Sequence, residues 1–329
     1  MSEIRFEQVS LQFPGAPRPV VKQFSFTVQS GQILVILGPS GCGKTTVLKL
    51  VNRLYEPTIG KVYLNQMDIS QMPVTRLRQQ IGYVIQQVGL FPHMTVAQNI
   101  AVVPKLLGWS RGKIQQQVEM LLTLVDLPVS DFRDRYPLQL SGGQQQRVGL
   151  ARALAGNPDV ILMDEPFAAL DAITRSNLQE EILRLQRHFG KTILFVSHDI
   201  EEALRLADQM IIMQNGCLIQ TGKPFDILSR PTNAFVRDLV SADDILRQLS
   251  LLRVETFMAP IPVNPSLNSS LSQTLSQTTI PSQHNLRQAL SLLLGKGESQ
   301  LTVVQAGEIV GVLSLNQIRD LACRMGAAL

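Results

Sequence analysis

Short apolar runs alternate with stretches of helical periodicity between about residues 31 and 214. Four of these runs have the length and the branched side chains of strands that are buried on both faces. They are residues 32–38, 159–164, 192–197 and 209–214. This alternation of strand and helix predicts an α/β fold, built from βαβ units around a largely parallel sheet.

Two helices and a hairpin are predicted around these strands. Residues 47–54 and 178–189 each place apolar side chains along one helical face. The second of these helices is expected to end at Gly190, because glycine is favoured just after a helix. Asn215 and Gly216 follow the last apolar run and predict a tight turn between two strands.

The amino-acid composition changes near residue 262. Residues 262–283 are rich in Ser, Thr, Gln, Asn and Pro and contain no charged residue, which is typical of a linker or a long loop. Beyond them, residues 285–294 and 315–322 predict helices, and residues 301–305 and 308–314 predict strands. A small α/β unit is therefore expected to close the chain.

Composition and charge narrow the class of protein. The 329 residues, 45% of them hydrophobic, suffice for one large domain and a smaller one. Thirty basic and 26 acidic residues nearly balance, so the net charge of +4 favours a solvated surface and no nucleic-acid partner. Cys42, Cys217 and Cys323 are too widely spaced for a disulfide framework or a zinc site, which fits a reducing cytoplasm. The N-terminus does not resemble a signal peptide, and the apolar runs are far shorter than the roughly 20 residues that cross a bilayer.

The segment GPSGCGKTT after the first apolar run matches the phosphate-loop pattern G-x-x-x-x-G-K-[ST]. Such a loop turns backbone amides toward nucleotide phosphates at the start of a helix, whose partial positive charge adds to the binding. Lys44 would neutralise the β- and γ-phosphates, and the Thr45 hydroxyl would ligate magnesium. The alternative is an ordinary glycine-rich turn with a surface lysine. The predicted phosphate-binding residues are Gly38, Pro39, Ser40, Gly41, Cys42, Gly43, Lys44, Thr45 and Thr46.

Polar residues follow two of the other predicted strands. Asp164 ends the run ILMD and Glu165 follows it, and His198 follows TILFVS. Ligands of open α/β sheets bind near the carboxyl ends of the strands. Asp164 is therefore expected to hold magnesium through water, and Glu165 to polarise the attacking water. The alternative is that the carboxylates only cap a strand and that the histidine fills a surface or core position. The neighbouring phosphate loop favours the catalytic interpretation.

The motif LSGGQ at 140–144, together with MDEP, the triplet ALD at 169–171 and VSHD, resembles the nucleotide-binding subunit of ATP-binding-cassette transporters. This resemblance implies a homodimer that clamps two ATP molecules, with the LSGGQ motif of each copy facing the nucleotide of the other. It also implies a cassette over residues 1–240, with a mixed sheet and a helical subdomain at about 90–155. The alternative is that SGGQ only caps a helix. The residues assigned to the partner's nucleotide are Ser141, Gly142, Gly143 and Gln144.

Further positions follow from the same resemblance. Phe13 corresponds to the aromatic residue that stacks on adenine, although it could also be a core phenylalanine. Gln86 corresponds to the glutamine that touches magnesium and reports the nucleotide state to the membrane partner. Asp171 corresponds to the acidic residue that crosses the dimer interface, and alanines at 168 and 172 stand where relatives usually show glycine and proline. The predicted catalytic set is Glu165, His198, Gln86 and Lys44, and the predicted magnesium ligands are Thr45, Gln86 and Asp164.

Residues 81–109, 135–147 and 163–181 resemble the ATPase subunits of bacterial importers for quaternary-amine osmoprotectants such as glycine betaine, choline and carnitine. The resemblance implies a peripheral protein on the cytoplasmic face of the inner membrane. Its partners would be an integral membrane permease and, indirectly, a substrate-binding protein. Segment 89–96 would receive a short helix of the permease, or its apolar residues pack internally. Import of another small solute and a soluble, non-transport ATPase of this architecture are the alternatives.

Residues 285–322 resemble a single cystathionine-β-synthase-type (CBS) repeat, with residues 254–263 as its first strand. Residues 241–329 are therefore expected to form a linker and a regulatory or dimerisation domain. Such repeats usually occur in pairs, so pairing across the ATPase dimer is one possibility. A small dimerisation domain without a ligand is the other.

Overall fold

The computed structural model divides the chain into two compact units, Met1–Lys223 and Pro224–Leu329. This division falls before residue 240, where the sequence analysis places the end of the cassette. Helix α9 (Pro224–Ser229) contacts α10 (Ala234–Val240) and α11 (Ile245–Ser250), so these helices group with the C-terminal unit. The residues that the structure describes are 2–86, 89–168, 170–260, 276 and 278–327.

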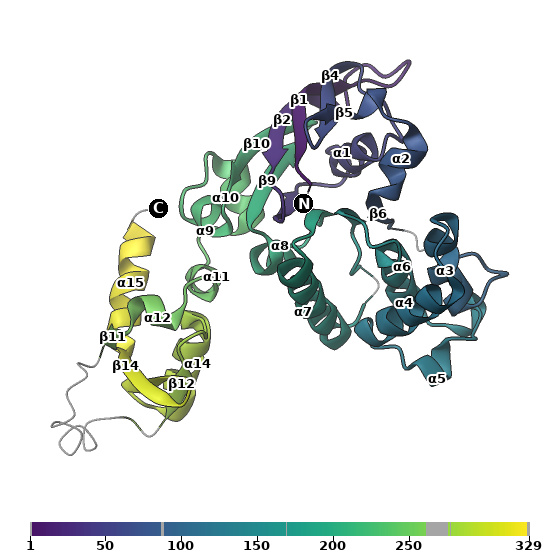
Figure 1. Cartoon of the computed structure of the whole chain (residues 1–329). Helices are drawn as coiled ribbons and strands as arrows, with labels where there is room; N and C mark the ends of the chain where they lie inside the picture. The colour runs from purple at the N-terminus through teal and green to yellow at the C-terminus, as the bar shows by residue number, and fades with distance from the viewer. Residues whose placement is uncertain (1, 87–88, 169, 261–275, 277, 328–329) are drawn as a thin grey trace. The chain divides into compact units, whose positions relative to one another are not determined.

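The first unit contains a six-stranded sheet in the order β10-β9-β3-β8-β7-β6. Figure 1 labels its strands β6, β9 and β10. All neighbouring pairs are parallel except β9 and β10, which form the predicted hairpin. Asn215 and Gly216 both have positive φ at its turn. The largely parallel sheet is thus confirmed. Its strands are β3 (Ile33–Leu37), β6 (Ile81–Val84), β7 (Val160–Asp164), β8 (Thr192–Val196), β9 (Gln209–Gln214) and β10 (Cys217–Gly222).

An antiparallel sheet of order β2-β1-β4-β5 accompanies the parallel one. Its side chains, those of the parallel sheet and those of helix α1 (Lys44–Val51) share one hydrophobic core. Within it, the rings of Phe6 and Phe24 pack edge to face at 5.1 Å between centroids. The bounds of these strands are β1 (Ile4–Leu11), β2 (Val21–Val28), β4 (Ile59–Leu64) and β5 (Met67–Asp68); the short helices η1 (Ile69–Gln71) and α2 (Val74–Gln79) follow.

Helices α3, α4, α5 and α6 pack together between β6 and β7 in the chain, as Figure 1 shows. Thr95 and Ser141 begin α3 and α6 with capping boxes, in which a side chain and a backbone amide exchange hydrogen bonds three residues apart. Both helices therefore start at a defined residue. The bounds are α3 (Val96–Leu106), α4 (Arg111–Leu124), α5 (Val129–Phe132), η2 (Pro137–Gln139) and α6 (Gly142–Leu154).

Helix α7 (Ala172–Phe189) ends at Gly190, which has the left-handed conformation expected of such a cap. Leu178 and Ile182 are buried as the periodicity predicts, whereas Phe189 is half exposed at the last turn. Helix α8 (Ile200–Leu206) follows β8 and contacts β3. The helix predicted for residues 47–54 ends three residues earlier, so Leu54 is exposed beyond it.

The C-terminal unit contains a four-stranded sheet of order β11-β14-β13-β12, with α14 and α15 packed against it and against each other. Buried leucines, valines and isoleucines from the sheet and both helices form its core. Both predicted helices and both predicted strands of this unit are confirmed. Their bounds are β12 (Thr279–Pro281), α14 (Leu286–Lys296), β13 (Gln300–Gln305), β14 (Glu308–Ser314) and α15 (Leu315–Ala327).

Two expectations for this unit are wrong in part. Residues 254–263 are not one strand: α12 (Val254–Phe257) closes a helical turn in which Met258 N–H donates to Val254 O, and only β11 (Ala259–Pro260) is extended. Residues 261–263 lie outside the described residues. The predicted linker ends early, because Ile280 is buried in β12, which pairs in parallel with β13; most of that linker also lies outside the described residues.

No helix in the described ranges is long and apolar enough to cross a bilayer.

The parallel sheet should carry much of the stability of the first unit. We expect Leu194→Ala to lower the free energy of unfolding by about 2–5 kcal/mol, because the side chain is fully buried and its removal leaves a cavity. Urea denaturation followed by circular dichroism measures the effect. The control Leu106→Ala, at a position 78% exposed, should change stability by no more than about 0.5 kcal/mol. Equal effects of the two variants would contradict this account of the core.

Candidate functional site

The phosphate loop connects β3 to α1 and is fixed by close backbone contacts. A Cβ atom on Gly38 would lie 2.3 Å from the carbonyl oxygen of Met213, and one on Gly43 would lie 2.6 Å from that of Val20. Both glycines also have positive φ. No other residue type fits these two positions without moving the neighbouring backbone. The glycine spacing of the motif is therefore a packing requirement of the loop as well as a sequence pattern.

Lys44 is 6% exposed, and its ammonium group donates hydrogen bonds to the carbonyl oxygens of Gly38 and Pro39 at 2.7 and 2.9 Å. In the described part of the chain, Lys44 forms no ion pair with a carboxylate. Carbonyl dipoles and the nearby charge of Asp164 compensate this buried positive charge only in part, which favours an anionic ligand. Burial also raises the pKa of the Cys42 thiol, so this loop cysteine is neutral at physiological pH. Pro39, Ser40 and Gly41 are exposed at the tip of the loop, and Thr46 is partly buried.

Thr45 and Asp164 meet at the edge of the sheet, although 119 residues separate them in the chain. The Thr45 hydroxyl donates to Asp164 Oδ1 at 2.9 Å. Burial raises the pKa of the Asp164 carboxyl; the hydrogen bond from Thr45 opposes this shift, and the charge of Glu165 adds to it. Magnesium in nucleotide sites uses few protein ligands, and it prefers oxygen atoms. The Thr45 hydroxyl and the Asp164 carboxylate supply two such oxygen ligands side by side. The residues present thus fit this ion.

Two predicted catalytic side chains converge on the carboxylate of a third, Glu165. His198 Nδ1 lies 3.2 Å from Glu165 Oε1, and Gln86 Nε2 donates to Glu165 Oε2 at 3.1 Å. His198 is 62% exposed, so the cluster opens to solvent. The structure therefore brings together Glu165, His198 and Gln86, which come from three separate parts of the sequence.

The backbone of Glu165 is held in a conformation that is unusual for a side-chain-bearing residue. Its φ is +47°, in the left-handed region, and its N–H donates to Val196 O at 3.0 Å. Gln146, a buried residue of α6, donates to Glu165 O at 3.3 Å. Such strain persists only where neighbouring groups fix it. Sequence reasoning missed Gln146, because nothing in the run QQQR distinguishes one glutamine from the next.

Ser141 and Gln144 form the capping box of α6. The Ser141 hydroxyl accepts the Gln144 N–H at 3.3 Å, and Gln144 Oε1 accepts the Ser141 N–H at 3.0 Å. Ser141 and Gly142 are exposed, and nothing lies within 4 Å of a Cβ added to Gly142. Among the described residues, no hydrogen bond joins positions 141–144, including Gly143, to the phosphate loop. One chain therefore presents the LSGGQ motif as a capped, open helix start and does not place it at its own phosphate loop.

Phe13 and Asp171 lie outside the cluster around Glu165. The Phe13 ring is partly buried and packs edge to face against Tyr55, with 5.1 Å between centroids. Asp171 caps α7 by accepting the Thr174 N–H at 3.0 Å, and this hydrogen bond lowers the pKa of its carboxyl. Ala168 and Ala172 leave this cap intact. Ala169, between the MDEP block and Asp171, lies outside the described residues.

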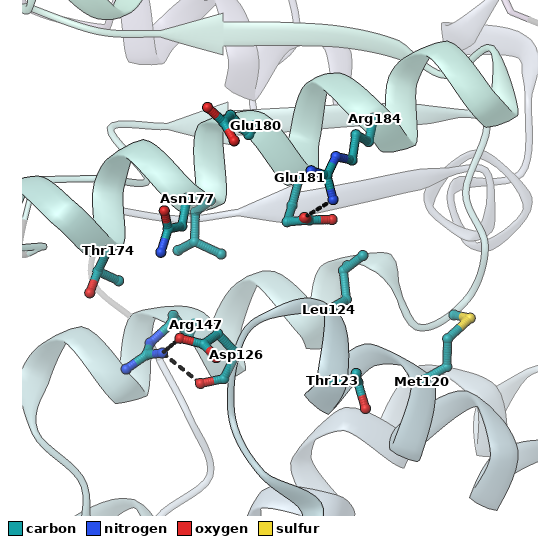
Figure 2. A pocket seen from close by; sticks show the side chains of 11 residues that line it. Met120, Thr123, Leu124, Asp126, Arg147, Thr174, Asn177, Glu180, Glu181 and Arg184 are labelled. Carbon is teal, nitrogen blue, oxygen red and sulfur yellow. Dashed lines mark hydrogen bonds and ion pairs between the residues drawn. The ribbon is translucent and has the colours of Figure 1, made fainter.

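A cavity of about 700 Å³ lies between α4, α6 and α7, and Figure 2 shows the side chains that line it. Two charged pairs line it: Arg147 donates to the carbonyl oxygen of Asp126 at 2.8 Å, and Arg184 on the α7 side pairs with Glu181 at 2.8 Å. The charged groups of this cavity are thus largely paired with one another. None of the predicted catalytic or phosphate-binding residues lines it.

Comparison with known proteins bears on the class of this site. The profile of the family described as ABC transporter matches residues 21–168. The chain is 43% identical to the carnitine transport ATP-binding protein OpuCA of Listeria monocytogenes over 96% of its own length and 76% of that protein. It is 46% identical to the glycine betaine/carnitine/choline transport ATP-binding protein OpuCA of Bacillus subtilis over 83% of its length and 71% of that protein. The glycine betaine uptake system ATP-binding protein YehX of Escherichia coli is 43% identical over 96% of this chain and 98% of its own.

A solved structure extends the comparison to the fold. The ATP-binding cassette MJ0796, in a dimeric post-hydrolysis state bound to ADP and Pi, superimposes with a TM-score of 0.63 and 31% sequence identity. The match covers 67% of this chain and 98% of that one. Sheet, phosphate loop and site residues define a nucleotide-hydrolysing cassette. The chain belongs to the ABC transporter family, as one of its ATP-binding subunits. The predicted fold class and family are confirmed.

The burial of Asp164 leads to a prediction about stability. A carboxyl whose pKa is raised in the folded state binds its proton more tightly there, so its ionisation at neutral pH opposes folding. We expect Asp164→Asn to melt at a higher temperature than the wild type at pH 7 without nucleotide or divalent ions, while ATP hydrolysis falls. Asparagine can still accept the hydrogen bond from Thr45.

This difference in melting temperature should shrink as the pH is lowered toward 3.8, the ordinary pKa of the group, because the wild-type carboxyl becomes protonated. Differential scanning fluorimetry across pH measures it. Asp134→Asn, at an exposed position, is the control and should leave the melting temperature unchanged. A lower melting temperature for Asp164→Asn at pH 7 would contradict the assignment.

Proposed function

We propose that this protein binds and hydrolyses ATP to energise a membrane importer of quaternary-amine osmoprotectants. The observation that carries the proposal is the convergence of a phosphate loop, the Thr45–Asp164 pair and the cluster around Glu165 on one edge of the sheet. Lys44 and the start of α1 would bind the phosphates. Thr45 and Asp164, with Gln86, would hold Mg²⁺, which neutralises phosphate charge when it is bound.

Glu165 is assigned as the residue that orients and polarises the attacking water. Its two carboxylate oxygens already have separate partners, Gln86 on one and His198 on the other. This arrangement fixes the direction of the carboxylate while leaving it open to solvent on the His198 side. Fixed positioning of this kind is the main way in which proteins catalyse phosphoryl transfer to water.

Dimerisation is proposed to complete each site. The LSGGQ motif offers an exposed helix start: its capping box occupies the amides of Ser141 and Gln144, and no hydrogen bond within the described residues occupies those of Gly142 and Gly143. A second helix N-terminus favours the γ-phosphate. Leu138, two residues before the motif, and Ile173, two residues after Asp171, have largely exposed side chains. A partner surface would cover both. The MJ0796 cassette, which resembles this chain, is described as a dimer.

Segment 89–96 is proposed to contact the permease. Its shape is fixed by Asn99, a fully buried residue whose side chain accepts the Phe91 N–H at 2.8 Å and donates to the carbonyl oxygens of Phe91, Met94 and Thr95. Phe91 itself is 40% exposed, which argues against the alternative of internal packing. The segment thus presents an aromatic side chain on a rigid loop.

Two neighbouring features support the same surface. Arg152 of α6 donates to Gly89 O at 2.7 Å and lies over the Phe91 ring. A groove of about 250 Å³ between α3 and α4 is lined by small and aliphatic side chains together with two glutamines and the basic side chains of Lys105, Arg111 and Arg133. A short helix of a membrane subunit fits such a groove. This assignment also implies a peripheral location on the cytoplasmic face of the membrane and indirect contact with a substrate-binding protein.

The class of solute is proposed from the relatives, whose names specify carnitine, choline and glycine betaine transport. The C-terminal unit is proposed to regulate or dimerise the ATPase as a CBS-like repeat. Its order β12-α14-β13-β14-α15 supports one compact α/β repeat of this kind.

Removing the charge of Glu165 should stop turnover without removing nucleotide binding. We expect Glu165→Gln to lower kcat by about 10²–10⁴-fold, the contribution of a general base, and to accumulate an ATP-bound dimer. Steady-state phosphate release and size-exclusion chromatography with light scattering measure the two effects. The matched control Glu180→Gln, on the surface of α7, should keep wild-type turnover. Full ATPase activity of Glu165→Gln would refute the assignment of the base.

Uptake experiments test the transport role. In a strain lacking the chromosomal gene, the wild-type chain should restore uptake of radiolabelled glycine betaine, choline or carnitine and growth at high salt. Lys44→Ala should not, because the buried ammonium is lost, whereas the exposed control Lys22→Ala should. If none of the three solutes depends on the chain while it co-purifies with a hydrophobic membrane subunit, another solute is transported. Absence of such a subunit would favour the soluble ATPase.

A further inference from the structure

Arg175, in the first turn of α7, joins the loop that carries Asp171 to the loop that carries His198. Its Nη2 donates to Leu170 O at 3.1 Å, directly before Asp171. Its Nη1 lies 3.5 Å from Asp199 Oδ2, directly after His198. One guanidinium group therefore touches the immediate neighbour of each of two predicted site residues.

The loop around His198 is fixed further by a buried carboxylate. Glu202 Oε2 accepts the Ser197 hydroxyl at 2.7 Å, and Ser197 Oγ in turn accepts the Asp199 N–H at 2.9 Å. Arg175 Nε lies 4.0 Å from the other oxygen of Glu202. Of the two residues that flank His198, Ser197 is thus bonded to a carboxylate near Arg175, and Asp199 carries the other carboxylate that Arg175 contacts.

The chemistry of this junction requires arginine. The guanidinium group is planar and presents its N–H donors in several fixed directions, so one side chain can donate to the Leu170 carbonyl and to Asp199 while its charge also lies 4.0 Å from Glu202. A lysine ammonium is a point charge on a flexible stem and would satisfy only part of this set. Glu202 is 7% exposed, so its charge depends on the guanidinium and on Ser197 for compensation.

We propose that Arg175 is a positioning residue of the ATPase reaction. It fixes the orientation of His198 toward Glu165 and, at the same time, the position of Asp171. The loop that carries His198 and the loop that carries Asp171 therefore move together. The inference rests on the proposed function, since it assigns to Asp171 the contact with the second subunit. Under this proposal, a change in the position of His198 in one reaction centre also changes the position of Asp171 at the dimer interface, because Arg175 connects the two loops.

The consequence for catalysis is a loss of kcat without a loss of ATP affinity. Within the described residues, Arg175 forms no hydrogen bond or ion pair with the phosphate loop, Lys44 or the Thr45–Asp164 pair. Displacing His198 and Asp171 by about 1 Å should cost turnover about 10- to 100-fold, whereas binding of the phosphates should persist. Splitting kcat from KM therefore distinguishes positioning from general damage.

The test uses the full chain with Mg²⁺ and ATP, and compares Arg175→Ala, Arg175→Lys and the control Arg184→Ala, an exposed arginine of the same helix. We expect Arg175→Ala to lower kcat about 10- to 100-fold with KM for ATP changed less than about twofold. Arg175→Lys, which keeps the stem and the charge, should recover only part of this loss while melting at the wild-type temperature. Arg184→Ala should match the wild type.

Several outcomes would overturn the inference. These are wild-type kcat in Arg175→Ala, full activity of Arg175→Lys, or a rise in KM that accounts for the whole loss. If Arg175→Ala does not fold, Arg175→Gln and Asp199→Asn decide, because each removes one charge while keeping shape, and kcat within about twofold of wild type in both would reject the proposal.

Failure of this inference is distinguishable from failure of the proposed function. If Glu165→Gln accumulates an ATP-bound dimer while the Arg175 variants turn over normally, only the role of Arg175 is wrong. If the wild-type chain does not hydrolyse ATP at all, the proposed function itself fails.

Discussion

The site depends on one electrostatic constraint, the burial of the Lys44 ammonium among backbone carbonyls. The hydrogen bonds to Gly38 and Pro39 hold it over the loop, but carbonyl dipoles compensate a full charge only partly. The loop cannot relax to relieve this, because Gly38 and Gly43 are wedged against the backbone near Met213 and Val20. A rigid cradle with a residual positive charge therefore exists before any anion arrives, which is what preorganised phosphate binding requires.

Around that cradle, the reaction centre is assembled by elements that end at one edge of the sheet. Thr45 comes from the start of α1, Asp164 and Glu165 from the end of β7, and His198 from the end of β8. The left-handed backbone of Glu165 turns its carboxylate toward Gln86 and His198 and away from the strand direction. The strain at this residue is offset by the carbonyl of Val196 and the amide of Gln146.

The sequence predicts the elements whose signal is local. Continuous apolar runs such as 192–197 identify the buried parallel strands, and glycine spacing identifies the loop. Strands β1 and β2 lack a continuous apolar run, because they are half-buried and their pairing shifts register between Phe6 and Val9. Residues 254–257 resembled a strand, yet their helical turn is set by the partner of Val254 N–H, the carbonyl of His284. Gln146 and Arg175 could not be predicted, because their contacts join residues far apart in the chain and leave no periodic trace.

Helix α6 has a mechanical property that follows from two of its side chains. Gln146 contacts the carbonyl of Glu165, and Arg152 contacts the carbonyl of Gly89. Six residues of helix separate them, about 9 Å along a stiff axis. A helix transmits displacement along its axis with little compression, so α6 connects the carbonyl of Gly89 to the carbonyl of Glu165 through a stiff element. A movement of α6 at Arg152 therefore also moves Gln146, whose side-chain amide holds the strained turn at Glu165.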